Sequence, residues 1–190
     1  MTDKAHIRSE AISVRDRIEP HANDADDAAT NFLEAIAPKP GQSVALYWPK
    51  GREFDTLPLI HELLLAGITC ALPVIQKDAR LLKFAAYKDG DAMEEGPFKI
   101  IQPKTGDSTL WVDPDIFVVP MLAFDRHGNR MGYGMGYYDE TLKYYRAMKP
   151  VIAVGYAYGQ QAVLFNLPAE AHDEKMDWII TPQKAQRFKT

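Results

Sequence analysis

The residues best suited to chemistry gather in one glycine-rich segment, residues 124–139, which reads FDRHGNRMGYGMGYYD. Its glycines, Gly132, Gly134 and Gly136, let a backbone approach a ligand closely and adopt positive φ. The N–H groups of such a loop, together with the N-terminus of a helix predicted to start near residue 138, suit a phosphate-like anion. A flexible loop without a ligand has the same spacing, so the pattern leaves both interpretations open.

The segment matches neither of the two common phosphate-binding loops. No Gly-Lys-Ser/Thr follows, as a Walker A loop requires. The glycines are spaced GxGxG and lie late in the chain, whereas the dinucleotide fingerprint is GxGxxG in a first strand–turn–helix unit.

Arg130 and Asp139 flank these glycines. A guanidinium beside such a loop can hold phosphate oxygens in pairs, although a surface cation is the simpler interpretation of Arg130. Asp139 falls in the first turn of the predicted helix, where the helix dipole favours an acid. The same carboxylate could instead bind Mg²⁺ together with phosphate oxygens.

The apolar pattern predicts alternating strands and helices. We expect helices over 4–19, 24–37, 56–66 and 138–148, with Thr56 as a possible N-cap, and strands over 43–47, 68–72, 81–86, 116–119, 151–154 and 178–181. Residues 88–108 read as a loop. This order predicts an α/β fold: an open three-layer, mostly parallel sheet with helices on both faces, in one domain over 1–190. Ligands of such sheets bind beyond the carboxyl ends of the strands, and strand 116–119 leads into the glycine-rich segment.

Composition narrows the partners. Of 190 residues, 22 are basic and 26 acidic, and a net charge of −4 argues against nucleic-acid binding. The single cysteine, Cys70, lies in an apolar stretch, which predicts a buried thiol in a reducing cytoplasm. The polar first residues are not typical of a secretory signal, and the longest apolar run, 116–124, is too short to span a bilayer. We expect a soluble, cytoplasmic protein without a membrane partner.

The glycine-rich segment resembles the signature of the 5-formyltetrahydrofolate cyclo-ligase family, also called methenyltetrahydrofolate synthetase. Further similarities to this family cover most of the chain: Lys4-Ala-His-Ile-Arg8, Glu53-Phe-Asp-Thr56, Pro97-Phe98 with Gln102-Pro103, and residues 172–177. Tyr133 and Met135 stand where certain relatives carry Arg and Lys, so fewer cations would face the phosphates of ATP.

The resemblance implies an enzyme that uses ATP and Mg²⁺ to convert 5-formyltetrahydrofolate into 5,10-methenyltetrahydrofolate. Transfer of the γ-phosphoryl group to the formyl oxygen would give an imino phosphate. Folate N10 would then attack the activated carbon, and phosphate would leave as the ring closes. Two alternatives remain, a non-catalytic folate-binding module and a different small-molecule enzyme on the same fold. We expect a monomer or a weak homodimer.

The resemblance also implies roles for individual residues. Arg130 and Tyr138 would be catalytic, and Asp139 and Asp173 would hold Mg²⁺. Glu53, Phe98, Tyr137 and Tyr138 would bind the folate. The ATP-binding residues would be Lys4, Arg8, Arg130, Gly132, Gly134, Gly136, Tyr137, Tyr138 and Asp139. From the sequence alone, Lys4 and Arg8 also fit a solvated helix face, Phe98 fits packing, and Asp173 fits a loop acid.

Overall fold

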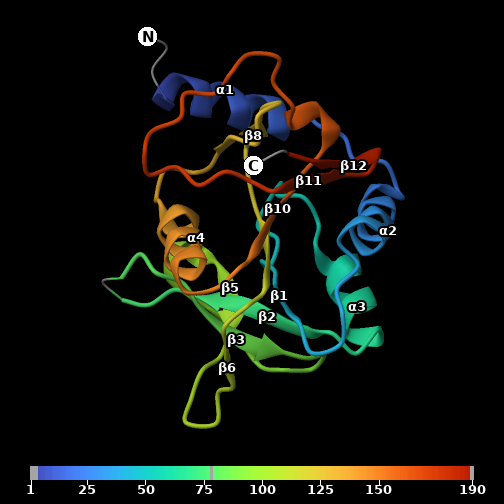
Figure 1. Cartoon of the computed structure of the whole chain (residues 1–190), viewed down its shortest axis with the longest axis vertical. Coiled ribbons are helices and arrows are strands. Elements are labelled where there is room, and N and C mark those ends of the chain that lie inside the picture. Colours follow the sequence, from blue (N-terminus) through green and yellow to red (C-terminus); the bar gives the residue numbers. More distant parts are fainter. Residues whose placement is uncertain (1–3, 78, 189–190) are drawn as a thin grey trace.

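A computed structural model describes residues 4–77 and 79–188 of the chain. An eight-stranded sheet runs through its centre in the order β12-β11-β10-β7-β1-β2-β3-β6 (Figure 1). The strands from β11 to β2 pair in parallel, and β12, β3 and β6 pair antiparallel at the two edges. Their bounds are β1 Ser43–Ala45, β2 Thr69–Val74, β3 Lys83–Tyr87, β6 Trp111–Val112, β7 Ile116–Val119, β10 Ile152–Tyr156, β11 Trp178–Thr181 and β12 Lys184–Arg187.

Helices cover both faces of the sheet. Helices α2 (Asp24–Ile36) and α3 (Leu57–Leu65) pack on one face through a core that includes Phe32 and Leu59. Helix α4 (Tyr137–Met148) packs on the other face through Leu142 and Tyr145. The central strand β7 is buried along its whole length because both of its faces are covered. The predicted α/β fold, mostly parallel with helices on both faces, is confirmed.

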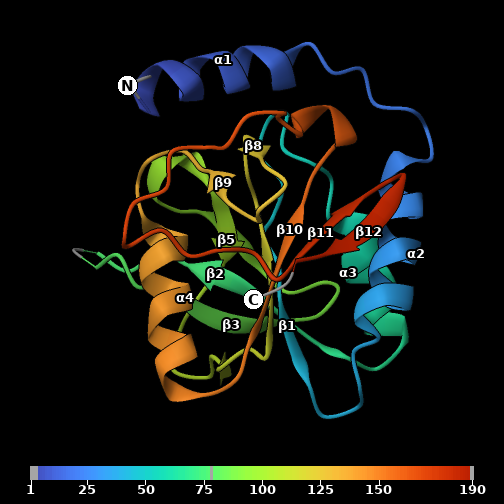
Figure 2. The ribbon, with the colours of Figure 1, turned by 45° about the horizontal axis from the view of Figure 1, so that its top comes forward.

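Helix α1 (Lys4–Asp16) does not lie on a face of the sheet. It crosses the loops at one end of the molecule, where Ile7 and Ala11 pack against Leu122, Met131 and Leu167 (Figure 2). The predicted helix over 4–19 therefore ends earlier, at Asp16. This position places one side of α1 above the glycine-rich loop.

Two small ribbons complete the fold. Strands β8 (Ala123–Phe124) and β9 (Arg130–Met131) form a hairpin just after β7, at the start of the glycine-rich segment. Strands β4 (Met93–Glu95) and β5 (Ile101–Pro103) pair across a 3₁₀ turn, Pro97–Lys99. The prediction that residues 88–108 form only a loop is therefore wrong.

The start of α3 also differs from the prediction. The Thr56 side chain does not cap this helix, because its hydroxyl donates to the Tyr47 carbonyl oxygen at 2.6 Å. Thr56 instead ties the chain before α3 to the segment that follows β1. Among the described residues, no helix is both long and apolar enough to cross a membrane.

Candidate active site

One cavity of about 680 Å³ lies at the carboxyl ends of β1, β2 and β7, where Tyr47, Ile75 and Pro120 line it. Strand β1 leads to α3 on one face of the sheet and β7 leads to α4 on the other. Because the connections diverge between these neighbouring strands, a crevice forms there, and such a crevice is the usual ligand site of an open α/β sheet. The cavity therefore lies at the strand ends, where the sequence predicts the ligand site.

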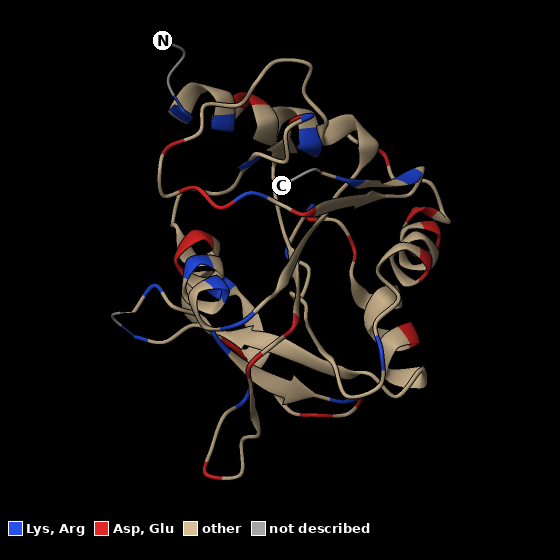
Figure 3. Ribbon diagram, viewed as in Figure 1, with Lys and Arg blue, Asp and Glu red and all other residues tan. Residues whose placement is uncertain are grey.

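The structure brings every predicted site residue to this cavity. The lining includes Lys4, Arg8, Glu53, Phe98, Arg130, Gly132, Gly134, Gly136, Tyr137, Tyr138, Asp139 and Asp173. The cations and acids of this set come from α1, the segment between β1 and α3, the glycine-rich loop with the first turn of α4, and the segment before β11. Figure 3 colours the basic and acidic residues along these segments. Their individual roles stay predictions.

The glycine-rich loop ends at the N-terminus of α4. Gly134 has φ +90° and Gly136 has φ +74°, whereas Gly132 has no positive φ, so two of the three glycines use this conformational freedom. Gly136 precedes the first turn of α4, and no side chain caps that turn. Within the described chain, the backbone N–H groups of Tyr137, Tyr138 and Asp139 have no hydrogen-bond partner. These N–H groups are free to bind an anion at the cavity.

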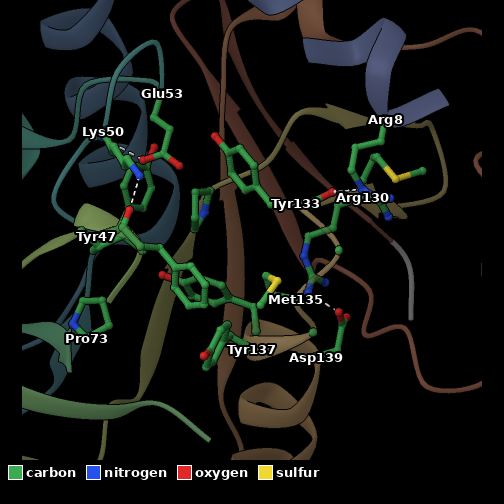
Figure 4. A pocket seen from close by; sticks show the side chains of 18 of the residues that line it. Arg8, Tyr47, Lys50, Glu53, Pro73, Arg130, Tyr133, Met135, Tyr137 and Asp139 are labelled. Atoms are coloured by element: carbon green, nitrogen blue, oxygen red, sulfur yellow. Dashed lines mark hydrogen bonds and ion pairs between the residues drawn. The ribbon is translucent and has the colours of Figure 1, made fainter. Parts of the chain in front are cut away.

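Arg130 is held firmly at this end of the cavity. Its side chain is only 6% exposed, and Nη2 donates to Asp139 Oδ1 at 2.7 Å. Nη1 donates to the Glu174 carbonyl oxygen, and the Glu174 N–H donates to Asp139 Oδ1 at 3.0 Å. A guanidinium fixed in this way is ready to face charge that develops on a phosphoryl group (Figure 4).

Helix α1 adds two further cations. Arg8 Nε donates to the Gly132 carbonyl oxygen at 3.0 Å. Lys4 Nζ lies 2.7 Å from Asp173 Oδ2 and 3.0 Å from Glu170 Oε1. Burial would raise the pKa of Asp173, but hydrogen bonds from Lys4 and from the Glu170 N–H lower it overall. Lys4 is therefore neutralised by acids of the protein in this structure.

The predicted magnesium ligands, Asp139 and Asp173, fit a loosely held cation. Each carboxylate uses one oxygen for the hydrogen bonds above, and the other, Oδ2 of Asp139 or Oδ1 of Asp173, accepts none from the described residues. The described chain contains no cluster of three or more potential metal ligands. Magnesium commonly takes one or two carboxylates and completes its shell with phosphate oxygens and water, so this donor set suits Mg²⁺ carried by a nucleotide.

The other end of the cavity is aromatic and contains one acid, Glu53 (Figure 4). Glu53 Oε2 accepts the Lys50 N–H at 2.9 Å. Burial raises the pKa of Glu53, and the Lys50 N–H, the Tyr133 hydroxyl and Arg15 oppose that rise. Phe98 is 53% exposed, and its ring centroid lies 6.3 Å from that of Tyr137.

Sequence reasoning missed Arg15 and the direction of Tyr133. Arg15 follows Arg8 by seven residues, about two helical turns, so Lys4, Arg8 and Arg15 share one side of α1. This helical spacing was the feature of the sequence that could have identified Arg15 as a residue of the cavity. From the sequence, Tyr133 was considered only for its effect on ATP binding. Its side chain points toward Glu53, so Tyr133 belongs to the aromatic end of the cavity as well (Figure 4).

Comparison with known proteins agrees with this geometry. The model of the 5-formyltetrahydrofolate cyclo-ligase family matches residues 1–182. The chain belongs to this family. Two cyclo-ligase relatives are those of Mycolicibacterium smegmatis, 35% identical over 150 residues (76% of this chain, 75% of the relative), and Escherichia coli K12, 34% identical over 160 residues (83% and 87%).

Solved structures of the family share the fold. A 5,10-methenyltetrahydrofolate synthetase from Aquifex aeolicus has a TM-score of 0.79 at 28% identity and covers 98% of this chain and 93% of its own. A synthetase from Mycoplasma pneumoniae has a TM-score of 0.73 at 21% identity, covering 95% and 99%, and supports the fold alone. The family resemblance of the sequence is thereby confirmed.

Proposed function

We propose that this chain catalyses the ATP-dependent cyclisation of 5-formyltetrahydrofolate to 5,10-methenyltetrahydrofolate, with release of ADP and phosphate. One observation carries the proposal. In a chain of the cyclo-ligase family, a single cavity joins an anion-binding loop rich in cations to an aromatic end that contains one acid. We infer that the protein acts in the cytoplasm as a monomer or weak homodimer.

The chemistry explains why both ends are needed. A formamide oxygen is a poor leaving group, so it first takes the γ-phosphoryl group of ATP and ADP is released. Folate N10 then attacks the activated carbon, the carbon–oxygen bond breaks, and the oxygen leaves as phosphate. Catalysis requires the formyl oxygen in line with the γ-phosphorus, and the shared cavity supports that alignment.

The phosphates would lie on the loop of Gly132, Gly134 and Gly136. The free N–H groups of the first turn of α4 would bind them, with Arg8 and Lys4 above. Arg130 would stabilise the transferring phosphoryl group. Asp139 and Asp173 would hold Mg²⁺, which neutralises phosphate charge when it is bound.

The folate would occupy the aromatic end. Ionised Glu53 would accept hydrogen bonds from the donor-rich edge of the pterin, and Phe98 and Tyr137 would contact its flat face. Burial, followed by the charge of Glu53, raises the pKa of Tyr138, so its hydroxyl stays protonated. That hydroxyl can then donate to the formyl oxygen and position it.

The direct test mixes the purified protein with 5-formyltetrahydrofolate, ATP and Mg²⁺ and follows the near-ultraviolet absorbance of the methenyl product. We expect product formation that stops when ATP or Mg²⁺ is omitted. Turnover without ATP would indicate a different enzyme on this fold. Folate binding without turnover would indicate a non-catalytic module. Arg130→Ala should lose turnover and keep most of its folate affinity.

A further inference from the structure

Three polar side chains from distant parts of the chain meet at the aromatic end of the cavity. Arg15 comes from the last turn of α1, Glu53 from the segment between β1 and α3, and Tyr133 from the glycine-rich loop. Arg15 Nη1 donates to the Tyr133 hydroxyl, and Arg15 Cζ lies 5.6 Å from the centroid of the Tyr133 ring. The Tyr133 hydroxyl points toward the Glu53 carboxylate and interacts with it (Figure 4).

The burial of Arg15 requires an explanation beyond stability. The residue is only 8% exposed, and its Nε atom is buried with no partner among the described residues. Its ion pair with Asp16, at 3.3 Å, joins it to an acid whose side chain is 49% exposed. Such an exposed pair contributes little, whereas burying a guanidinium with an unpaired donor destabilises a fold. A functional role of the positive charge of Arg15 at the cavity therefore explains its burial better than a contribution to stability does.

We infer that Arg15 and Tyr133 are positioning residues, which together orient Glu53 and keep it ionised for the pterin edge. The inference rests on the proposed function and deepens it. A neutral carboxylic acid carries a proton of its own, so only the ionised form can use both oxygens to accept two neighbouring N–H donors. Tyr133 transmits the effect, because its hydroxyl accepts from Arg15 and points toward the Glu53 carboxylate.

The surroundings of Glu53 support this arrangement. Burial works against its ionised form, and Lys50 from its own segment, Tyr133 and Arg15 favour that form. Two further tyrosines from other elements interact electrostatically with the carboxylate, Tyr47 after β1 and Tyr138 on α4, and burial raises the pKa of both. Because these two stay neutral, the positive charge that helps Glu53 comes from Arg15 and Lys50.

The test uses Tyr133→Phe, which removes only the hydroxyl, and Arg15→Gln. The matched controls are Tyr144→Phe and Arg17→Gln, which change exposed side chains outside the cavity. The values of kcat and of KM for 5-formyltetrahydrofolate and for ATP are measured from mildly acidic to mildly alkaline pH, with thermal unfolding as a check of folding. Tyr133→Phe carries the test if Arg15→Gln does not fold.

We expect both site variants to raise the KM for 5-formyltetrahydrofolate about tenfold below neutral pH, the effect of losing one hydrogen bond to a charged group. The rise should be smaller at alkaline pH, because Glu53 ionises there without help. The acid limb of the KM profile should move to higher pH. The KM for ATP and kcat should change by less than about twofold, and the double variant should be no worse than Arg15→Gln, as expected for residues acting in series.

An unchanged KM for folate in both site variants would overturn the inference. So would a pH-independent rise, or a rise in the KM for ATP instead. Absence of turnover by the unmodified protein would refute the proposed function rather than this inference. Equilibrium binding of 5-formyltetrahydrofolate across the same pH range would then decide whether Arg15 and Tyr133 support Glu53.

Discussion

The loop at the phosphate end of the cavity depends on a backbone shape that only glycine adopts easily, and Gly134→Ala tests this dependence. Gly134 has φ +90°, and an added Cβ would lie 3.0 Å from Arg8 Cζ. The guanidinium is the end of a flexible side chain and can move by a few tenths of an ångström, so the backbone dominates the effect. A positive φ costs an alanine about 1–2 kcal/mol.

When no ATP is bound to the Gly134→Ala variant, residue 134 can relax to a negative φ. Binding of the nucleotide would have to restore the strained shape, so about 1–2 kcal/mol is lost from the binding free energy. The KM for ATP should then rise about 5- to 30-fold, while the KM for 5-formyltetrahydrofolate stays the same. The assay is steady-state formation of the methenyl product at saturating folate.

Gly132→Ala provides the comparison within the same loop. Gly132 lacks a positive φ, and nothing lies within 4 Å of the place its Cβ would take. We expect a change in the KM for ATP of less than about threefold. Equal losses in the two variants would refute the argument from backbone shape, and an unchanged KM for ATP in Gly134→Ala would show that ATP does not need this conformation of the loop.

Three further predictions concern single side chains. Arg130→Lys keeps the charge but not the fork that reaches Asp139 and the Glu174 carbonyl, so kcat should fall about 100-fold with little change in the KM for folate, measured by the same assay. Asp125→Asn should lower the free energy of unfolding by about 2–3 kcal/mol in urea titrations at neutral pH, because the buried carboxylate accepts four hydrogen bonds and an amide cannot. Burial would raise the pKa of Asp125, but the four hydrogen bonds lower it below its ordinary value of 3.8. The stability that these bonds provide is therefore present above pH 3.8 and is lost as the pH falls through the pKa of the folded state. The variant should lack this loss of stability in acid. Burial raises the pKa of the Cys70 thiol to about 12, so a thiol reagent should label the native protein only as fast as it unfolds, and rapid labelling would contradict this.

The apolar pattern predicted the elements that are buried on both faces. Strands β7 and β11 were predicted with their observed ends, because continuous runs such as Ile116–Val119 have few other stable placements. The edge strand β12, Lys184–Arg187, was missed because it is polar and only partly buried. A tight turn brings it back beside β11, and its residues show no alternation of apolar and polar side chains that would predict a strand. Edge strands of this kind carry little signal in their own sequence.

Motif spacing predicted which residues reach the cavity but not which of them pair. Arg130 and Asp139 were both expected at the phosphates, yet their direct hydrogen bond depends on how the hairpin β8–β9 meets the start of α4. Arg15 and Tyr133 are 118 residues apart in sequence, and neither has a local pattern that points to the other. Pairings of this kind follow from the position of α1, which packs against loops rather than against the sheet.

The position of α1 has a consequence for how the site would bind ATP. Apolar contact between α1 and the loops is confined to a small cluster around Ile7 and Ala11. Lys4, at the first turn of α1, is already paired with Asp173. Lys4 Nζ carries three N–H donors and contacts the carboxylates of Asp173 and Glu170, so a phosphate that binds Lys4 would compete with these two acids. If the phosphate displaced Asp173, the released carboxylate would be one of the two proposed for Mg²⁺. The nucleotide and its cation would then enter together and supply both members of the Lys4–Asp173 pair with new partners.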